Sequence, residues 1–305
     1  MIPIRPINWL KIVVLAMIWG ASFMFVSIAL EGVGPLTLVA TRLTLGAVFL
    51  VILCGVKGIG LPSPRAENGG KIWIFAIVMG LFSNAIPFTM LSWAQLSVAS
   101  GFAGVCMAVV PLLVLPLAHV FVPGESMTLR RSIGFAIGTI GVIILIGPNA
   151  FASTGNDLES LARFSCVAAS ACYAIGSIST RLCPEVNMLS LSAAALCVAS
   201  VVSLPLALIY EGSPSALNLK VILALLYLGI LPTGVAQLLL TQVIRDAGPV
   251  FMSLVNYQVP LWSVVLGALV LAEPLPPSLL LGMVLILGGV ALSQLGKLRR
   301  LFGRG

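Results

Sequence analysis

The chain has 305 residues, of which 60% are apolar and only 8% are charged, and its formal net charge is +7. Soluble domains carry about 25% charged residues, so this composition excludes an ordinary soluble protein and indicates an integral membrane protein. The basic residues stand in short clusters between apolar runs and form no continuous basic face, which argues against a nucleic-acid-binding protein.

Ten apolar segments are long enough to cross a membrane as helices. Such a helix needs about 20 mostly apolar residues to span a hydrocarbon layer about 30 Å thick. The segments are residues 10–30, 35–56, 71–92, 98–121, 129–147, 162–182, 188–209, 220–242, 250–271 and 278–296. The sequence therefore predicts an all-α integral membrane protein with ten transmembrane helices.

The basic residues between these segments predict the orientation of the chain. Lysine and arginine are retained on the cytoplasmic side of a membrane. With the N-terminus inside, that side receives most of them, and the opposite side receives only Arg163 and Lys220. We therefore expect a multi-pass protein of the bacterial cytoplasmic (inner) membrane, embedded in the lipid bilayer, with both termini in the cytoplasm.

The two halves of the chain share markers at nearly constant spacing. Gly80, Pro111, Glu125, Gly134 and Gly141 are followed in the same order by Gly229, Pro260, Glu273, Gly282 and Gly289. This pattern predicts an internal duplication, with residues 1–150 as the first five-helix repeat and residues 151–305 as the second. Because each repeat has an odd number of spans, we expect the second to be inverted relative to the first, with a central cavity between them.

Proline and glycine residues mark special positions in the predicted helices. Pro111 and Pro260 fall near mid-membrane at equivalent positions of the two repeats, and each removes a main-chain hydrogen bond from its helix. We expect them to act as hinges or to shape the cavity, although a proline can also be structural only. The glycines of helices five and ten predict close packing, as a scaffold or a dimer contact, so the protein is expected to be a monomer or a weak homodimer.

Two ionisable residues, Arg42 and His119, come closest to the interior of a predicted span. An ionised side chain at the bilayer centre costs about 2.5–3.5 kcal/mol on translocon scales, so each is a candidate functional group. Arg42 lies seven residues into its helix. It binds a carboxylate, braces helices against backbone carbonyls, or extends to the nearby outer surface. His119 lies near the cytoplasmic end of helix four, either as an interfacial residue or as a titrating group.

No aspartate or glutamate lies deep in a predicted span, which disfavours the buried carboxylate that proton-driven exporters of cationic drugs commonly need. A zwitterionic or neutral substrate fits better. Uncharged polar and aromatic residues at central depth then remain for recognition, with helix-to-helix bonding and packing as alternative roles. The predicted substrate-binding residues are Trp19, Ser22, Asn84, Phe88, Tyr173, Ser177, Thr233, Gln237, Asn256 and Tyr257.

The residues that metal or cofactor chemistry would need are sparse. The chain has a single histidine and six cysteines, and these form neither a CxxC pair nor a Cys/His cluster. We therefore expect no metal, no cofactor and no catalytic residues. A membrane-embedded enzyme, which would need a constellation of acid, base or metal ligands, is the least favoured alternative. A channel and a non-transporting receptor remain further alternatives.

Several of these residues also match a family pattern. They are Trp19-Gly20-Ala21-Ser22-Phe23, the weaker Tyr173-Ala174, Pro35 leading to Arg42, and the repeated proline, glutamate and glycine markers. With them the chain resembles the EamA branch of the drug/metabolite transporter superfamily, and within it the YddG-like exporters of amino acids, aromatic ones included. The resemblance implies two five-helix halves, alternating access and export of small organic metabolites. Export of other drugs or metabolites is the alternative.

One position departs from the family pattern. Many relatives carry a lysine eight residues after the tryptophan, whereas here Ser27 stands at that position in the first half and Arg181 in the second. A substrate-contacting role for that lysine therefore does not carry over.

Overall fold

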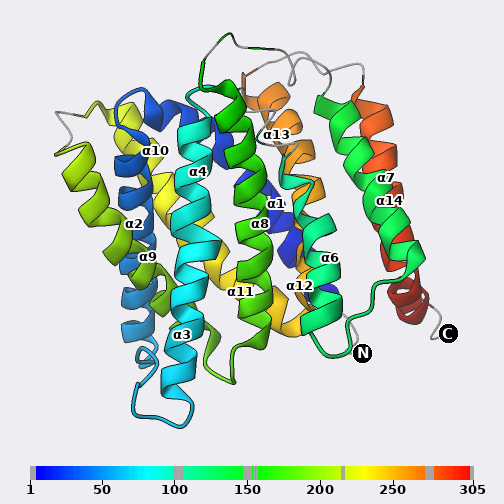
Figure 1. The fold of residues 1–305 in the computed structure, drawn as a ribbon, viewed down its shortest axis with the longest axis horizontal. Coiled ribbons are helices and arrows are strands. Elements are labelled where there is room, and N and C mark those ends of the chain that lie inside the picture. The colour runs from blue at the N-terminus through cyan, green and yellow to red at the C-terminus, as the bar shows by residue number, and fades with distance from the viewer. Residues whose placement is uncertain are drawn as a thin grey trace.

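The computed structural model describes residues 5–98, 103, 106–146, 153, 155, 157–213, 217–271 and 278–302, and these residues form helices and no strands. The helices, with η for π-helical segments, are α1 Pro6–Leu30, α2 Pro35–Val56, α3 Gly69–Gly80, η1 Leu81–Ala85, α4 Ile86–Ala94, α6 Val110–Phe121, α7 Leu129–Ile146, α8 Glu159–Leu182, α9 Met188–Tyr210, α10 Leu219–Gly229, η3 Ile230–Val235, α11 Ala236–Ala247, α12 Pro249–Met252, α13 Val255–Leu271 and α14 Leu279–Phe302. The bundle is shown in Figure 1.

Six helical segments of the described chain are long and apolar enough to cross a membrane: Pro6–Leu30, Pro35–Val56, Gly69–Ala94, Glu159–Leu182, Met188–Tyr210 and Leu219–Ala247. Val110–Phe121 and Leu281–Ser293 are shorter apolar helices. Large apolar side chains also cover the outside of the bundle, for example Val201 and Ile209, which are 72% and 74% exposed. An apolar exterior of this kind is suited to lipid, so the chain has the construction of a multi-pass membrane protein.

The fourth predicted span differs most from the structure. The sequence predicts a helix over residues 98–121, whereas α6 begins only at Val110 and has 12 residues, and part of the preceding stretch lies outside the described residues. Pro111 is thus the second residue of α6 rather than an interior residue. A proline is tolerated there because the first amides of a helix have no partner within it.

Two of the long spans contain a π-helical turn in the middle. η1 joins α3 to α4, and η3 joins α10 to α11. In each turn a side chain bonds back to the carbonyl five residues earlier: Asn84 Nδ2 donates to Met79 O at 3.2 Å, and Thr233 Oγ1 donates to Leu228 O at 2.7 Å. A wider turn frees main-chain carbonyls, and these two side chains satisfy one in each segment.

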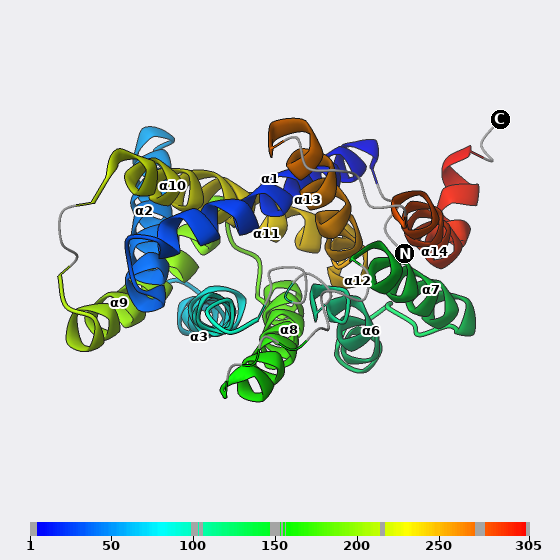
Figure 2. The same ribbon diagram turned by 90° about the horizontal axis from the view of Figure 1, so that it is seen from above.

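The helices α7 and α14 form a separate pair at one edge of the bundle (Figure 2). Their glycines face each other's backbones. A Cβ atom added at Gly134 would lie 2.7 Å from Gly289 O, and one added at Gly141 would lie 2.8 Å from Ile286 N. A Cβ at Gly282 would in turn lie 3.1 Å from Gly141 O. Small residues therefore let the two backbones approach closely, as expected for helices five and ten.

At the opposite edge, α2 packs along α9, and α1 crosses the middle of the bundle between the two edges (Figure 2). The start of α1 and the end of α14 lie at the same end of the bundle (Figure 1). Glu273 and the predicted repeat boundary at residues 150 and 151 lie outside the described residues. The centre of the bundle, between α1, α4, α8 and α11, is where the candidate site lies.

Candidate functional site

A cavity of about 120 Å³ lies among the helices at the centre of the bundle. Its wall is formed by residues of α1, α2, η1, α4, α8, η3, α11, α12 and α13, together with Met107 and Val110 next to and in α6. None of the described residues of α7 and α14 lines it. The helices that surround the cavity are thus distinct from the pair that packs through glycine.

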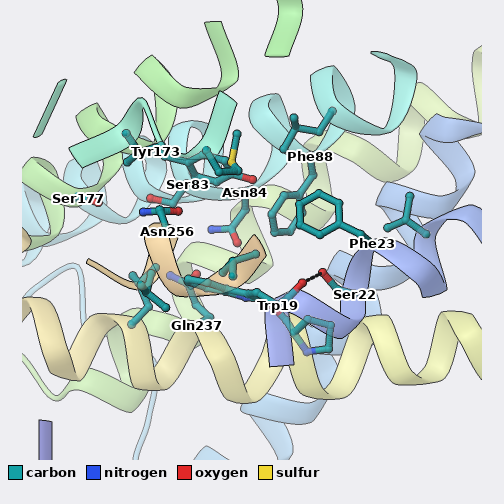
Figure 3. Close-up of a pocket in the computed structure, with 18 of the residues that line it drawn as sticks. Trp19, Ser22, Phe23, Ser83, Asn84, Phe88, Tyr173, Ser177, Gln237 and Asn256 are labelled. Atoms are coloured by element: carbon teal, nitrogen blue, oxygen red, sulfur yellow. Dashed lines mark hydrogen bonds between the residues drawn. The ribbon is translucent and has the colours of Figure 1, made fainter. Parts of the chain in front are cut away.

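Most of the residues predicted to bind substrate line this cavity. They are Trp19, Ser22, Asn84, Phe88, Tyr173, Ser177, Gln237 and Asn256. Figure 3 shows them around one space, although they come from helices far apart in the sequence. The structure thus brings them together around one cavity.

Four amide side chains, those of Asn84, Gln95, Gln237 and Asn256, line the cavity and contribute uncharged polar groups beside several serine hydroxyls. Asn84 is 1% exposed and donates to Met79 O, and Asn256 Nδ2 donates to Ser253 O at 3.1 Å. Gln237 is 4% exposed, and its Nε2 has no hydrogen-bond partner. A buried donor without an acceptor costs about 1–3 kcal/mol, so Gln237 is a position where a bound molecule would be stabilised.

Aromatic rings form much of the remaining wall. Trp19 is held in place because its Nε1 donates to Pro232 O at 3.1 Å, and Ser22 Oγ donates to Trp19 O at 2.7 Å (Figure 3). The rings of Phe88 and Tyr173 lie 6.5 Å apart at an interplanar angle of 59°. Such surfaces bind flat apolar groups and leave the few polar groups to set their orientation.

Arg42 also lines the cavity, although it is only 6% exposed. Its Nε donates to Thr233 Oγ1 at 3.0 Å, and its Cζ lies 3.9 Å from the centroid of the Phe88 ring. The interpretation of Arg42 as extending to the outer surface is therefore wrong, because its side chain is directed into the bundle. The hydrogen bond that holds Arg42 goes to a side-chain hydroxyl, that of Thr233, rather than to a backbone carbonyl.

Two of the predicted substrate-binding residues do not line the cavity. Thr233 is 1% exposed and is engaged by Arg42 and Leu228 O. Tyr257 is fully buried, and its hydroxyl donates to Phe135 O at 2.8 Å. The sequence predicts both at central depth. The hydroxyl of each is bonded to residues of other helices, so neither residue lines the cavity.

The remaining singled-out residues lie away from the cavity wall. Pro111 and Pro260 are buried in α6 and α13 and are absent from the lining. Pro260 has no N–H to offer the carbonyl of Asn256, four residues earlier, which is a cavity residue. His119 is exposed near the end of α6 and does not line the cavity.

Sequence reasoning missed several lining residues, among them Phe23, Ser83, Leu91, Ser92 and Ser253. A signal for some of them is present in the sequence, because they continue the same helix face. Phe23 lies four residues after Trp19, and Ser92 lies four residues after Phe88, spacings that place side chains one above the other. Extending the face along each helix would have found them.

No group of three or more histidine, cysteine, aspartate or glutamate side chains that could hold a metal ion occurs among the described residues. The residues that the structure places in the lining likewise include no aspartate or glutamate. The cavity can therefore offer aromatic surface, amides, hydroxyls and a single guanidinium.

Comparison with known proteins gives a consistent result. The model of the EamA-like transporter family matches residues 8–147 and again residues 161–295. The uncharacterized transporter YoaV of Bacillus subtilis is 25% identical over 296 residues, which cover 95% of this chain and 98% of that protein. A probable terminal-alkyne amino-acid exporter of Streptantibioticus cattleyicolor is 25% identical over 287 residues, 94% of this chain and 91% of that one.

The uncharacterized inner membrane transporter YedA of Escherichia coli K12 is 28% identical over 288 residues, 93% of this chain and 89% of that protein. A solved crystal structure with 22% sequence identity matches with a TM-score of 0.79 and covers 98% of this chain and 100% of the other. That likeness shows that the two proteins share a fold.

Proposed function

Because this chain belongs to the EamA-like transporter family, we propose that it is a secondary transporter that exports small organic metabolites, amino acids with aromatic side chains among them, by alternating access. The observation that carries the proposal is the central cavity, with its aromatic walls and its few amide groups. A cavity of this kind suits a small molecule with a flat apolar part and polar ends.

The proposal includes two inverted five-helix repeats, residues 1–150 and 151–305. The family model matches the chain twice, once in each half, which supports a duplication. The π-helical turns η1 and η3 follow Gly80 and Gly229 directly, at the positions that the sequence pairs. The glycine contacts support inversion, because Gly134 meets Gly289 while Gly282 meets Gly141, an exchange expected of a two-fold axis.

Alternating access requires the two halves to move around a fixed site. The cavity is lined from both halves, by α1, α2, η1 and α4 and by α8, η3, α11, α12 and α13. A rocking motion between the halves would therefore open the cavity first to one side and then to the other. We propose Pro111 and Pro260 as hinge residues of this motion, and both termini as cytoplasmic.

Amino acids are favoured as cargo by two observations. A relative of similar length is named as a probable exporter of a terminal-alkyne amino acid. The cavity also combines Trp19, Phe88 and Tyr173 with the amides of Asn84 and Gln237. Cationic drugs are the less favoured cargo, because the described lining contains Arg42 and no carboxylate.

The test is solute counterflow in liposomes that contain the purified protein. Labelled phenylalanine should accumulate transiently against an internal pool of the same amino acid, and this behaviour separates a carrier from a channel. Asn84→Ala and Gln237→Ala should lower the rate by about tenfold, the effect of losing one hydrogen bond to the cargo. Gln258→Ala is the matched control, because Gln258 is an α13 amide that does not line the cavity.

Absence of counterflow with phenylalanine and with a panel of other small metabolites would contradict the proposed function. If the Asn84 and Gln237 variants showed counterflow as fast as the wild type, the proposed function would stand, but these two amides would not belong to the binding site. A change of similar size in the Gln258 variant would indicate a general effect on the bundle.

A further inference from the structure

The guanidinium of Arg42 is a buried cation without an anionic partner in the part of the chain that the structure describes. None of the four ion pairs among the described residues includes it. Its Nε bonds Thr233, and the two terminal nitrogens, Nη1 and Nη2, make no hydrogen bond with any described residue. Buried charges in proteins are normally paired and fully hydrogen-bonded, so Arg42 is an exception that calls for a partner.

The contacts that Arg42 does make fix its orientation without neutralising its charge. The guanidinium carbon Cζ lies over the Phe88 ring, 3.9 Å from its centroid, and Thr233 holds Nε at one edge. A cation–π contact contributes about 0.5–2 kcal/mol, less than the cost of an unpaired ion in the membrane. The two contacts leave the outer edge of the guanidinium, with Nη1 and Nη2, available to a ligand.

A second donor without an acceptor also lines the cavity, the amide of Gln237. Gln237 lies four residues after Thr233, the residue that holds Arg42, in the helix α11 that follows η3. Gln237 Nε2 is buried and has no acceptor. In Figure 3, Gln237 and Phe88 lie on opposite sides of the cavity. The Nη1 and Nη2 edge of Arg42 and the amide of Gln237, all without acceptors among the described residues, suit a carboxylate, which shares one negative charge between two oxygens.

We propose that Arg42 binds the carboxylate of the exported molecule and that the cavity thereby selects aromatic carboxylates whether or not they carry an amino group. This inference rests on the proposed function, because it assigns the cargo of the same cavity. A guanidinium binds a carboxylate through two parallel hydrogen bonds, which fixes the orientation of the cargo as well as its charge. Gln237 Nε2 donates to the same carboxylate.

The cavity has no corresponding group for an ammonium. Its described lining contains no aspartate or glutamate, so a free amine gains no ion pair there. An amine without a carboxylate would also lie near Arg42 and be repelled. The affinity of the cavity for a ligand therefore depends on whether the ligand carries a carboxylate, and an amino group changes it little.

Three compounds with the same benzyl-type ring separate these charges: 3-phenylpropionate is an anion, phenylalanine is a zwitterion and 2-phenylethylamine is a cation. Binding to the purified protein in detergent is followed by tryptophan fluorescence, and transport is followed by counterflow in liposomes. The wild-type protein should bind the two carboxylates at least about tenfold more tightly than the amine, which corresponds to one charged hydrogen-bonded contact.

Arg42→Gln should lose that preference, with carboxylate affinity lowered about tenfold or more and amine affinity unchanged or raised. Arg42→Lys keeps the charge but lacks the planar fork, so it should fall between the two. Thr233→Val keeps Arg42 but removes its anchor, and it should weaken carboxylate binding less than Arg42→Gln does. Melting temperature and gel filtration identify folded variants, and Arg42→Lys carries the test if Arg42→Gln does not fold.

The two assays distinguish the possible failures. Carboxylate binding that depends on Arg42, together with an absence of flux, would overturn the transporter and keep the binding site. Flux of all three compounds with no effect of Arg42→Gln or Arg42→Lys on affinity would keep the transporter and overturn the carboxylate site. Tight binding of 2-phenylethylamine to the wild-type protein would overturn it as well.

Discussion

The two π-helical turns have nearly the same backbone and different chemistry. η1 and η3 each follow a glycine, each interrupts a long span, and each contains a side chain that bonds back over five residues. Yet η1 and α4 present Asn84 and Phe88, whereas η3 and α11 present Thr233 and Gln237. Phe88 gives the cavity an aromatic surface, and Gln237 gives it a donor without an acceptor, whereas Thr233 holds Arg42 and does not line the cavity.

The helices that pack against the two glycines, α2 and α9, also carry different side chains. Arg42 of α2 lies beside Gly229, where a Cβ atom would be 3.3 Å from Arg42 O. On the other side, Ala195 of α9 lies beside Gly80, where a Cβ atom would be 2.5 Å from Ala195 O. Of these two residues only Arg42 lines the cavity, whereas Ala195 is buried away from it. Similar backbones thus carry unlike side chains, and the two halves do not contribute equivalent groups to the cavity.

The largest effect is expected for the two glycines that precede the π-helical turns, because each lets its helix approach a neighbouring helix closely. Gly80→Ala and Gly229→Ala each place a Cβ atom 2.5 Å from an atom of the facing helix, Ala195 O or Leu45 Cβ. Overpacking of this kind costs about 1–3 kcal/mol, so both variants should unfold at lower temperature in detergent.

Gly55→Ala is the matched control, because nothing lies within 4 Å of the added atom. It should be neutral or slightly stabilising, since alanine favours a helix by about 1 kcal/mol over glycine. If Gly80→Ala melted like the wild type while Gly229→Ala did not, the two turns would differ in packing as well as in chemistry.

A smaller effect is expected for the two prolines. Pro260→Ala supplies an amide to the carbonyl of Asn256 inside α13 and should stiffen the helix beside the cavity. Pro111→Ala changes the second residue of α6, where no helical bond is missing. We expect turnover in counterflow to fall several-fold for Pro260→Ala, with ligand affinity maintained, and to change less for Pro111→Ala. Equal turnover of both variants and the wild type would mark the prolines as structural only.

The smallest effect concerns the starts of α2 and α9. Asn187 caps α9 itself, with Oδ1 accepting from the amides of Leu189 and Ser190. α2 follows Gly34, which has no side chain, and the Glu211 carboxylate at the end of α9 accepts from the amides of Leu36 and Thr37 at 3.0 and 2.8 Å. Asn187→Ala should cost about 1 kcal/mol of stability.

Glu211→Gln retains one amide oxygen as an acceptor and loses the charge, so it should cost about 0.3–1 kcal/mol. Thermal unfolding measures both variants. A larger loss from Glu211→Gln than from Asn187→Ala would show that the cap across helices is the stronger of the two.

Much of the fold could be predicted because membrane helices have a strong one-dimensional pattern. Apolar runs placed the helices, and glycine spacing indicated the close packing of α7 with α14. The main error is the single helix predicted over residues 98–121. The length of an apolar run does not show where a helix begins, so Pro111 was interpreted as an interior residue rather than as part of a helix start. The π-helical turns were also not predicted, since apolar composition is the same in both kinds of helix.

The site was only partly predictable, for a reason of geometry. Depth along a helix can be counted from the sequence, and it correctly identified Asn84, Phe88 and Gln237 as central. The direction of a side chain around the helix is altered by a π-helical turn, and this is why Thr233 was assigned to the cavity although it supports Arg42. The partner of Arg42 lies 191 residues away in the chain, so no local pattern could reveal the contact.

The pairing of α7 with α14 also bears on the biosynthesis of the chain. α14 leaves the ribosome after the other described helices, and until then the glycine face of α7 has only lipid or another helix against it. Membrane insertion of α1 to α13 therefore cannot complete this edge of the bundle. A nascent chain arrested before residue 279 would leave the glycine face of α7 without α14, and synthesis of α14 would cover it.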